Sequence, residues 1–289
     1  MNENAQGMQR TAEDGIHVNP HGAALTVNAD DFGYTVGVNR GIAEAHARGI
    51  VTATTLMAVA PAFADAVVRA RDLPNLALGL HAVLAGPFRP LTAARELCAR
   101  DGCFPRSYPA AMAMLAVCPP RVLRAELAAQ AQKLVDAGVR IGHIDCHKHL
   151  HCLPFVWREF VSVARAFDIR RIRRPGDTVI TTIPYPATAV AADLLMRGLA
   201  ELAITESPHP ALRHFAGQRA VGRLDEAGLL AIITALPDGA TEFMVHPGYC
   251  DNDLRCSSRL TDSRERELAA LTSPRVRAAL AARGIVLQR

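Results

Sequence analysis

Near the start of the chain, Ala24-Leu-Thr-Val-Asn-Ala29 runs directly into Asp30-Asp-Phe-Gly33, and the rest of the sequence is interpreted outward from this segment. Its first six residues are mostly apolar and β-prone, which is typical of a buried strand. A helical pattern over residues 36–46 follows, before Gly49. A strand that leads straight into a helix indicates a βαβ unit, so we expect a parallel sheet to begin here.

The same alternation continues along the chain. Further strands are expected at residues 51–57, 76–81, 141–146, 169–173 and 241–245. Helical patterns cover residues 61–71, 119–137, 154–167, 187–202 and 224–236, and the tail from Ser263. This succession, without a linker or an internal repeat, predicts an α/β fold, an irregular TIM-like (β/α) barrel of about seven βα units.

Composition narrows the class of protein. The 289 residues are 50% hydrophobic and 21% charged, which excludes global disorder. The net charge of +4 is too small to indicate a nucleic-acid partner, and no apolar run is long enough to span a membrane. We expect a flexible tail at residues 1–22, without the apolar core of a secretion signal, and a single domain at 23–289 with an insertion at about 86–118.

Seven cysteines are an odd number in a chain large enough to fold without disulfides. We therefore expect reduced thiols and a cytoplasmic protein. A small-molecule substrate fits this composition better than a macromolecular partner, and a homodimer is compatible with it.

Residues suited to metal binding or acid–base chemistry follow the expected strands. Asp30 and Asp31 follow the first, His81 ends the third, His147 follows the fourth and His246 follows a late one. The carboxyl ends of the strands carry the active site in α/β barrels. Taken alone, the Asp30-Asp31 pair also fits a turn with a helix cap, and His246-Pro-Gly248 also fits a plain turn. Both aspartates reach one site only if the chain turns there, which Gly33 permits.

The segment His143-Ile-Asp-Cys-His-Lys-His-Leu-His151 places a polar residue at every second position. In an extended segment all five would line one face, an arrangement that suits a metal site or contact with water. Imidazoles favour a divalent transition metal, and carboxylates widen the choice towards magnesium. Cys146 and Cys152 suggest a structural zinc site as an alternative, although their spacing fits no zinc-finger pattern.

At these residues the sequence resembles the YdjC-like carbohydrate deacetylases, which include chitooligosaccharide deacetylases and hopanoid-associated deacetylases. The matching pieces are residues 28–33, Gly49-Ile-Val-Thr-Ala-Thr-Thr55, Gly79-Leu-His81, residues 143–151 and Met244-Val-His-Pro-Gly248. The resemblance implies an irregular barrel and hydrolysis of an N-acetyl group from an amino sugar. It also implies one divalent metal ion, Zn²⁺ or Mg²⁺, held by Asp31, His81 and His147, with Asp30 as general base and His246 as general acid.

Four further residues are candidates for supporting roles. Asp145 can fix the tautomer of a histidine, and His149 and His151 can orient His147, line the sugar site or face solvent. Arg173 and Arg174 precede Pro175 at a strand end and can pair with Asp30 or contact substrate. Of these two arginines, we take Arg174 as a candidate site residue. The run of arginines over residues 170–174 also fits a solvent-exposed face.

The substrate is expected to be an N-acetylated amino sugar, either an oligosaccharide or a glycolipid such as an N-acetylglucosaminyl hopanoid. Aromatic residues make up only 5% of the chain, which argues against a long oligosaccharide groove. The apolar residues 110–117 suit either an apolar aglycone or a short helix packed on the core. Two alternatives stay open: another metallohydrolase, such as a phosphoesterase or amidohydrolase, and an inactive metal- or sugar-binding barrel.

Overall fold

A computed structural model describes residues 22–203 and 212–289. Most of the expected flexible tail at residues 1–22 lies outside the described residues. All strand pairs are parallel, and the strands form one sheet in the order β5-β4-β3-β2-β1-β7-β6, with β8 paired to β1. The strands are β1 (Ala23–Phe32), β2 (Ala53–Leu56), β3 (Ala77–Ala82), β4 (His143–Cys146), β5 (Arg171–Ile172), β6 (His214–Ala216), β7 (Gly239–Val245) and β8 (Val286–Leu287).

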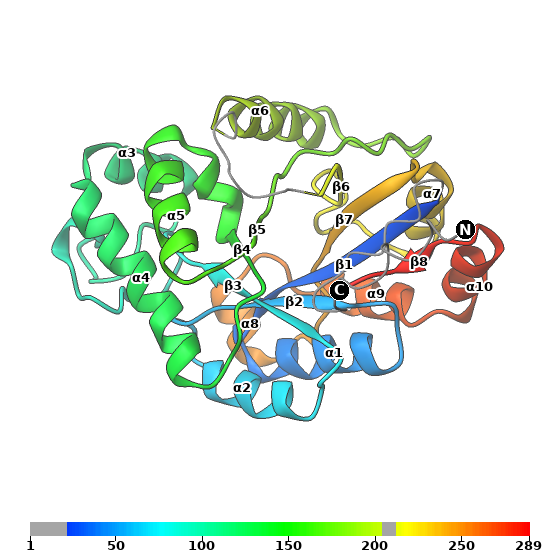
Figure 1. The fold of residues 1–289 in the computed structure, drawn as a ribbon, viewed down its shortest axis with the longest axis horizontal. Helices are drawn as coiled ribbons and strands as arrows, with labels where there is room; N and C mark the ends of the chain where they lie inside the picture. Colours follow the sequence, from blue (N-terminus) through cyan, green and yellow to red (C-terminus); the bar gives the residue numbers. More distant parts are fainter. Residues whose placement is uncertain (1–21, 204–211) are drawn as a thin grey trace, which may run out of the picture.

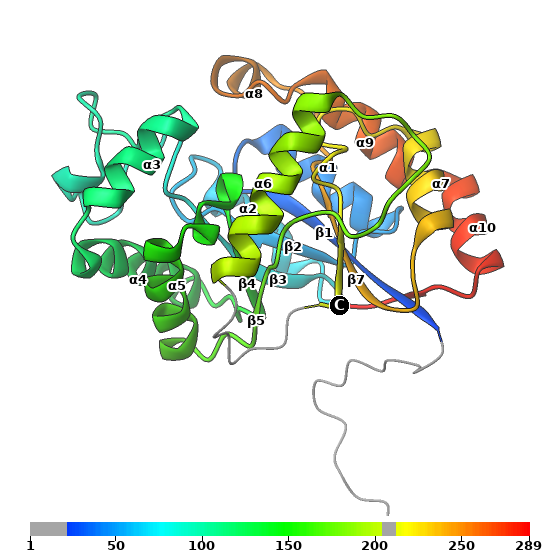
Figure 2. The same ribbon diagram turned by 90° about the horizontal axis from the view of Figure 1, so that it is seen from above.

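Helices surround this sheet. In Figure 1, α1 and α2 lie on one side of the strands and α6 lies on the other; Figure 2 shows α6 from above. The helices are α1 (Val36–Ala47), α2 (Phe63–Arg71), α3 (Tyr108–Val117), α4 (Pro120–Asp136), α5 (Pro154–Ala166), α6 (Ala187–Ala203), α7 (Glu226–Ala235), α8 (Asn252–Ser257), α9 (Asp262–Leu271) and α10 (Pro274–Ala282). Two short 3₁₀ segments, η1 (Arg95–Leu97) and η2 (His147–Cys152), complete the elements.

Local chemistry explains where several helices begin and end. The Thr35 side chain accepts a hydrogen bond from the backbone of Val38 and so caps α1. Proline occupies the first turn of α4 and of α5, where its missing N–H costs nothing. Gly138, with φ +78°, follows α4 in the left-handed conformation that commonly ends a helix.

The expected α/β class with a parallel sheet is confirmed, but the expected closure of a barrel is not. In the described residues the edge strands β5 and β6 do not pair with each other, so the sheet is an open half-barrel. The segment after β5 bridges part of the gap, because the Thr178 backbone N–H donates to the Phe215 carbonyl at 2.9 Å. Pro175 and Gly176, which cannot extend a regular ladder well, explain why a loop rather than a strand makes this contact.

The two faces of β1 have opposite characters. Leu25, Val27 and Ala29 belong to the hydrophobic core, whereas the alternating residues Asn28 and Asp30 are buried and polar. This period of two is the pattern of a strand. The inner face of the half-barrel therefore carries polar groups that must be paired or must bind something.

A distortion at the end of β1 brings its two aspartates together. Asp31 has φ +71°, and the pairing of β1 with β2 shifts register between Ala29 and Phe32. A bulge of this kind re-aims a side chain that would otherwise point to the opposite face. The turn that both aspartates need thus lies at Asp31 itself, before Gly33.

The strand expected at residues 141–146 is present as β4, and the condition for one polar face over residues 143–151, an extended chain throughout, holds only within that strand. β4 ends at Cys146, and the chain continues as η2, in which Lys148 and His149 have positive φ values of 58° and 54°. The left-handed pair breaks the alternation, so His149 and His151 do not share the face of His143 and Asp145. The helices expected after residue 186 and after Ser263 are confirmed.

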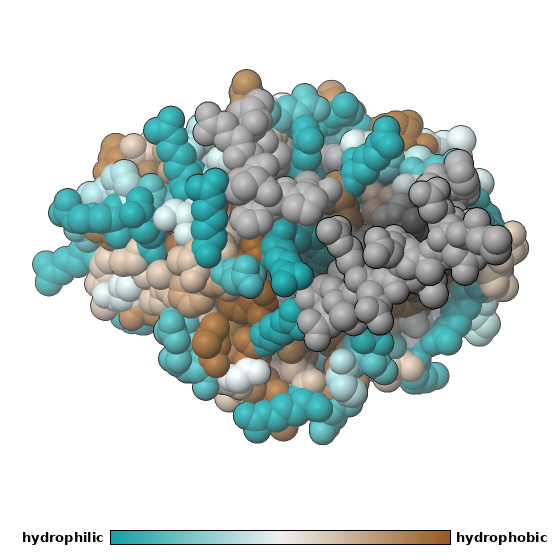
Figure 3. Space-filling view, viewed as in Figure 1, coloured by the Kyte–Doolittle hydropathy of each residue, from teal (hydrophilic) through white to brown (hydrophobic). Residues whose placement is uncertain are grey.

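The insertion at residues 86–118 contains η1 and α3. Residues 110–117 lie in α3, and Met112 and Met114 pack against the hydrophobic core. This supports the packed-helix interpretation of that stretch. None of the helices in the described ranges is long and apolar enough to cross a bilayer. Figure 3 shows hydrophilic residues scattered over the visible face, with hydrophobic residues between them.

Candidate metal centre and active site

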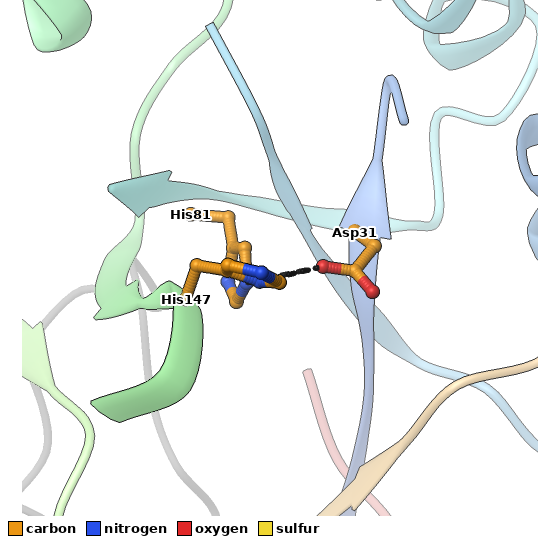
Figure 4. A group of neighbouring side chains, drawn as sticks. All are labelled: Asp31, His81 and His147. Atoms are coloured by element: carbon orange, nitrogen blue, oxygen red, sulfur yellow. Dashed lines mark hydrogen bonds and ion pairs between the residues drawn. The ribbon is translucent and has the colours of Figure 1, made fainter. Parts of the chain in front are cut away.

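Three side chains, from β1, from β3 and from the start of η2 directly after β4, meet at the carboxyl ends of the strands. Asp31 Oδ1 lies 3.3 Å from His81 Nε2 and 3.2 Å from His147 Nδ1, and the two histidine nitrogens lie 3.4 Å apart. Figure 4 shows both imidazoles directed at the same carboxylate. Asp31 and His81 are buried, and His147 is partly exposed. The three residues expected to hold a metal therefore present one ligand atom each to a common point.

The orientation of His81 is fixed from behind. Its Nδ1 donates to Asp145 Oδ1 at 2.6 Å, which directs Nε2 at Asp31 and His147; a cation bound at Nε2 would displace the proton that this nitrogen carries in the imidazolium form. Burial opposes charge on His81, but the Asp145 carboxylate outweighs it and raises the pKa of the imidazole to about 10. A carboxylate behind a histidine in this way increases its strength as a metal ligand. The position of Asp145 agrees with the supporting role expected for it.

Arg173 occupies the centre of the polar inner face. Its guanidinium donates to both oxygens of Asp30 at 2.7 Å, and it also lies 2.6 Å from carboxylate oxygens of Asp145 and Glu242. The arginine is fully buried, so these three carboxylates supply the charge compensation that burial demands. The neighbouring Arg174, expected from the sequence to be a site residue, is instead exposed. Alternate residues of an extended segment point to opposite sides, so Arg173 and Arg174 face different ways.

Asp30 is held as an anion. Burial raises the pKa of its carboxyl, but the Arg173 guanidinium overrides this and holds the pKa well below the usual range. Asn28 Nδ2 also donates to Asp30 at 2.8 Å, while Asn28 Oδ1 accepts from His143 Nε2 at 2.7 Å. Asp30, His81 and Asp145 form a second group with the composition of a metal site. The cationic Arg173 already lies between its two carboxylates, which favours the Asp31 group as the place for a metal.

The other oxygen of Asp31 is bound by an arginine from a distant helix. Arg264 Nη2, on α9, donates to Asp31 Oδ2 at 2.5 Å, and both side chains are buried. Asp31 Oδ1 is buried and makes no hydrogen bond of good geometry among the described residues; its nearest groups are His81 Nε2 and His147 Nδ1, at ion-pair distance. A buried carboxylate oxygen is stabilised by a cation, either a protonated imidazole or a metal ion held with the two imidazoles. The carboxylate is fixed so that one oxygen faces the two histidines.

His246 lies at the end of β7 and lines the same cleft as Asp30 and Asp31. Its backbone N–H donates to Glu267 Oε2 at 2.6 Å, which anchors the turn after the strand. Burial lowers the pKa of its imidazole to about 4. Burial also raises the pKa of Glu267 to about 7. The His246 ring is therefore neutral at pH 7 and lines the cleft.

His149 and His151 have separate surroundings. His149 Nε2 donates to Gln218 Oε1 at 2.9 Å and lines the cleft. His151 Nε2 donates to the Arg173 carbonyl at 3.0 Å, and its ring stacks on Phe160. Of the two, only His149 is placed to meet a substrate; His151 is a buried part of the scaffold.

The Asp31 cluster forms the floor of a cleft with a volume of about 920 Å³. The insertion forms one wall through Gly86 and Pro87 and through the start of α3. α6 contributes apolar side chains, and the segment between α8 and α9 contributes Ser258, Arg259 and Leu260. A cleft of this size suits a sugar-sized ligand, and its floor carries the polar groups.

Sequence patterns did not indicate Arg264, Glu267 or Glu242. Arg264 and Glu267 lie in the charge-rich stretch Asp262-Ser-Arg-Glu-Arg-Glu-Leu268, which resembles a solvated helix face. The structure buries both, three positions apart on one side of α9. The spacing of three residues, which places two side chains on one face of a helix, was the only feature of the sequence that could have indicated this pair.

Asp145→Asn is expected to weaken divalent-cation binding by about 10- to 100-fold, the range for losing a partner behind a metal-binding histidine. The amide still accepts the His81 proton, but it no longer adds negative charge behind the ring. Calorimetric titration of the metal-free protein with Zn²⁺ measures the change. Asp177→Asn is the matched control, because Asp177 is a buried carboxylate that accepts backbone hydrogen bonds from Gln218 and Arg219. Equal zinc affinity in wild type and Asp145→Asn would contradict the assignment.

The fold and this cluster define an α/β half-barrel with a candidate cation site at the carboxyl ends of its strands. Comparison with known proteins identifies the family to which this half-barrel belongs. A family model described as YdjC-like protein matches residues 24–282, and the chain belongs to that family.

Curated relatives in the family share the same description. A carbohydrate deacetylase from Geobacillus stearothermophilus is 35% identical over 262 residues, covering 90% of this chain and 94% of the relative. A carbohydrate deacetylase from Vibrio vulnificus (strain YJ016) is 31% identical over 263 residues, covering 88% of this chain and 89% of the relative.

A solved structure from Enterococcus faecalis V583, described as a candidate cellobiose-phosphate cleavage protein, is also similar. It matches with a TM-score of 0.76 and 26% identity, covering 93% of this chain and 97% of that one. The half-barrel is therefore found in an experimentally determined structure as well.

Proposed function

We propose that the protein is a metal-dependent hydrolase that removes the N-acetyl group from an acetylated amino sugar. The observation that carries the proposal is the meeting of Asp31, His81 and His147 at the floor of a sugar-sized cleft, with Asp30 beside them. The curated relatives described as carbohydrate deacetylases support the reaction class and the sugar.

The donor set fits a divalent cation. Two ligands held at about 2.0–2.1 Å from a tetrahedral zinc ion lie roughly 3.3 Å apart. The three ligand atoms here are separated by 3.2, 3.3 and 3.4 Å. One of them, Asp31 Oδ1, is a buried carboxylate oxygen that contacts only the two imidazoles. Two imidazole nitrogens and one carboxylate oxygen favour a transition metal such as zinc over magnesium.

When bound, such a cation would polarise the acetyl carbonyl and favour ionisation of water near neutral pH. The protein's own residues supply the proton transfers. Asp30 lines the cleft as a carboxylate kept ionised by Arg173, so it can accept a proton from the attacking water and pass it through His246, which lines the same cleft, to the departing amine. The same pairing makes Asp30 a weak base, which suits a water molecule that is already activated.

The departing amine needs a proton, and His246 is the residue placed to give it. Its ring has no hydrogen bond within the part of the chain that the structure describes, and it lines the cleft beside the two aspartates. Since burial lowers its pKa to about 4, the ring must gain a proton during the reaction. The charges of Asp30 and Asp31 favour that gain.

The test is acetate release from a panel of substrates by protein freed of metal with a chelator and then reloaded with Zn²⁺ or Mg²⁺. The panel contains N-acetylglucosamine, its β-1,4 oligomers and an N-acetylglucosaminyl lipid, and the acetate released from each is compared. We expect acetate only after a cation is restored. The panel also includes a phosphate ester, whose hydrolysis would reveal the alternative phosphoesterase activity. No acetate from any reloaded sample, or full activity in the chelated one, would refute the proposal.

A further inference from the structure

A second cavity lies in the insertion, apart from the cleft that holds the candidate metal centre. Its volume is about 410 Å³, and residues between Arg89 and Gly102 form its walls. None of these residues lines the cleft, so the two cavities are separate. Three of them are arginines, Arg89, Arg95 and Arg100, and none is acidic. This cavity is called the arginine hollow below.

The three guanidinium groups of the arginine hollow are unpaired within the described ranges. None of them donates a hydrogen bond or joins an ion pair there. The nearby acid Asp101 is engaged elsewhere, because it accepts from the Cys103 backbone N–H at 3.0 Å and pairs with Arg106 at 3.4 Å. Glu96, on η1, forms no ion pair with the three arginines. The hollow therefore gathers three positive charges without a counter-charge from the protein.

The backbone on one side of the hollow is anchored to α4. The backbone N–H groups of Leu91 and Thr92 donate to the Glu126 carboxylate at 3.0 and 2.9 Å. Glu126 is fully buried, and these donors already satisfy its charge. Ala93, which lines the hollow, has φ +52°, a conformation that is uncommon for residues other than glycine. Such backbone persists only where the surrounding structure holds it.

On the other side, Gly102 makes room for the guanidinium of Arg89. Gly102 has φ +74°, and a Cβ atom placed on it would lie only 3.0 Å from Arg89 Nη1. The turn that contains Gly102 is closed by two backbone hydrogen bonds, from Ala99 to the Cys103 carbonyl at 2.7 Å and from Gly102 to the Ala99 carbonyl at 3.0 Å. The Arg89 guanidinium therefore lies against the turn that carries Arg100.

We propose that the arginine hollow binds the phosphate or diphosphate group of a small phosphorylated metabolite. A guanidinium presents paired N–H donors that match two oxygens of a phosphate, and it stays charged at any physiological pH. A phosphate brings three acceptor oxygens and close to two negative charges, so it satisfies several guanidinium groups better than one carboxylate does. The volume lies within the range of small-molecule sites and leaves space for more than a bare anion.

The proposal does not depend on the proposed deacetylase activity. A short backbone ladder separates the hollow from the cleft: the Phe104 N–H donates to the Phe88 carbonyl at 2.8 Å, and the Gly86 N–H donates to the Pro105 carbonyl at 3.0 Å. Gly86 lines the cleft, whereas the arginines lie beyond the ladder. An occupant of the hollow leaves the cleft open, so its binding is measured apart from acetate release.

Calorimetric titration of the metal-free full chain with pyrophosphate tests the proposal. The metal is removed so that the candidate metal centre cannot bind the anion. We expect one pyrophosphate per chain, and Arg89→Gln and Arg100→Gln should each weaken its binding about 10-fold, because each removes a charged donor. Arg71→Gln is the matched control. Arg71 is an exposed arginine on α2 that lines neither cavity, so its loss lowers the net charge equally and should leave the affinity unchanged.

Gly102→Ala tests the geometry of the hollow while keeping every charge. The added methyl group meets the Arg89 guanidinium and displaces it, so the affinity for pyrophosphate should again fall about 10-fold. Gly138→Ala is its control. Gly138 has φ +78°, almost the same conformation, but no atom lies within 4 Å of an added Cβ. Gly138→Ala therefore introduces similar backbone strain and should bind pyrophosphate like wild type.

Two further ligands identify the source of the anion: citrate, and vesicles of phosphatidylglycerol compared with phosphatidylcholine. Citrate should bind more weakly than pyrophosphate, and equal affinity would reject phosphate as the preferred group. Vesicle binding that Arg89→Gln weakens, without binding of pyrophosphate, would overturn the small metabolite and assign the hollow to a lipid headgroup. Absence of pyrophosphate binding, or an affinity that Arg89→Gln, Arg100→Gln and Gly102→Ala leave unchanged, would overturn the proposal, whatever the result of the acetate assay.

Discussion

Asp30→Asn is expected to lower kcat for acetate release by about 1,000-fold or more while leaving the bound cation in place. Loss of a positioned general base costs about 10² to 10⁴ in rate, and Asp30 is the carboxylate beside the candidate ligands that is not itself a ligand in the Asp31 group. Asparagine keeps the shape and can still accept one hydrogen bond from Arg173, but it cannot take a proton from water. Acetate release and zinc content are measured on the same preparation.

Thermal unfolding of Asp30→Asn serves as its control, because Arg173 loses one of its three carboxylate partners. The reduced rate should appear at temperatures where the variant is fully folded. Activity within a few-fold of wild type in a folded, zinc-loaded Asp30→Asn protein would contradict the role given to Asp30.

His81→Ala is expected to abolish stoichiometric zinc binding and, with it, turnover. The imidazole is one of only three protein ligands in the group, so its removal should weaken zinc binding by more than the roughly 100-fold typical of losing an outer partner. It also leaves Asp145 without the proton it accepts at 2.6 Å. Zinc content after dialysis measures the effect.

His149→Ala is the matched control for His81→Ala. His149 comes from the same histidine-rich segment and lines the cleft, but it binds Gln218 rather than the Asp31 cluster. It should keep one zinc ion per chain. If His81→Ala kept its zinc and His149→Ala lost it, the account would be contradicted, and the metal centre would have to be assigned to the other histidines.

Strands with long apolar runs could be predicted from the sequence, and of the three shortest only β5 was expected, within residues 169–173. The side chains are buried along all 10 residues of β1 and along all but the first of the 7 residues of β7. Each strand therefore leaves a clear pattern in the sequence. β6 and β8 have 3 and 2 residues, and tertiary pairing rather than local preference forms them. The open edge between β5 and β6 depends on hydrogen bonds from a loop, which no periodicity reveals.

Topology indicated the edge of the sheet at which the site lies, whereas the choice of Asp31, His81 and His147 as ligands came from the resemblance to the YdjC-like deacetylases. The carboxyl ends of parallel strands share one edge of a sheet, so Asp31, His81 and His147 could be expected to meet although they are far apart in sequence. Their catalytic roles stay predictions. Residues 143–151 would share one face only in an extended chain, and two left-handed residues in η2 redirect the chain after β4. Arg264 was missed because a buried arginine in a charged helix looks like a solvated one.

Anomalous X-ray diffraction at the zinc absorption edge, on crystals of the zinc-loaded protein, tests most directly whether the cleft floor is a metal centre. The account predicts one strong peak per chain within bonding distance of Asp31 Oδ1, His81 Nε2 and His147 Nδ1. A protein with no peak there, or with its zinc at Cys146, Cys152 or another group, would contradict it.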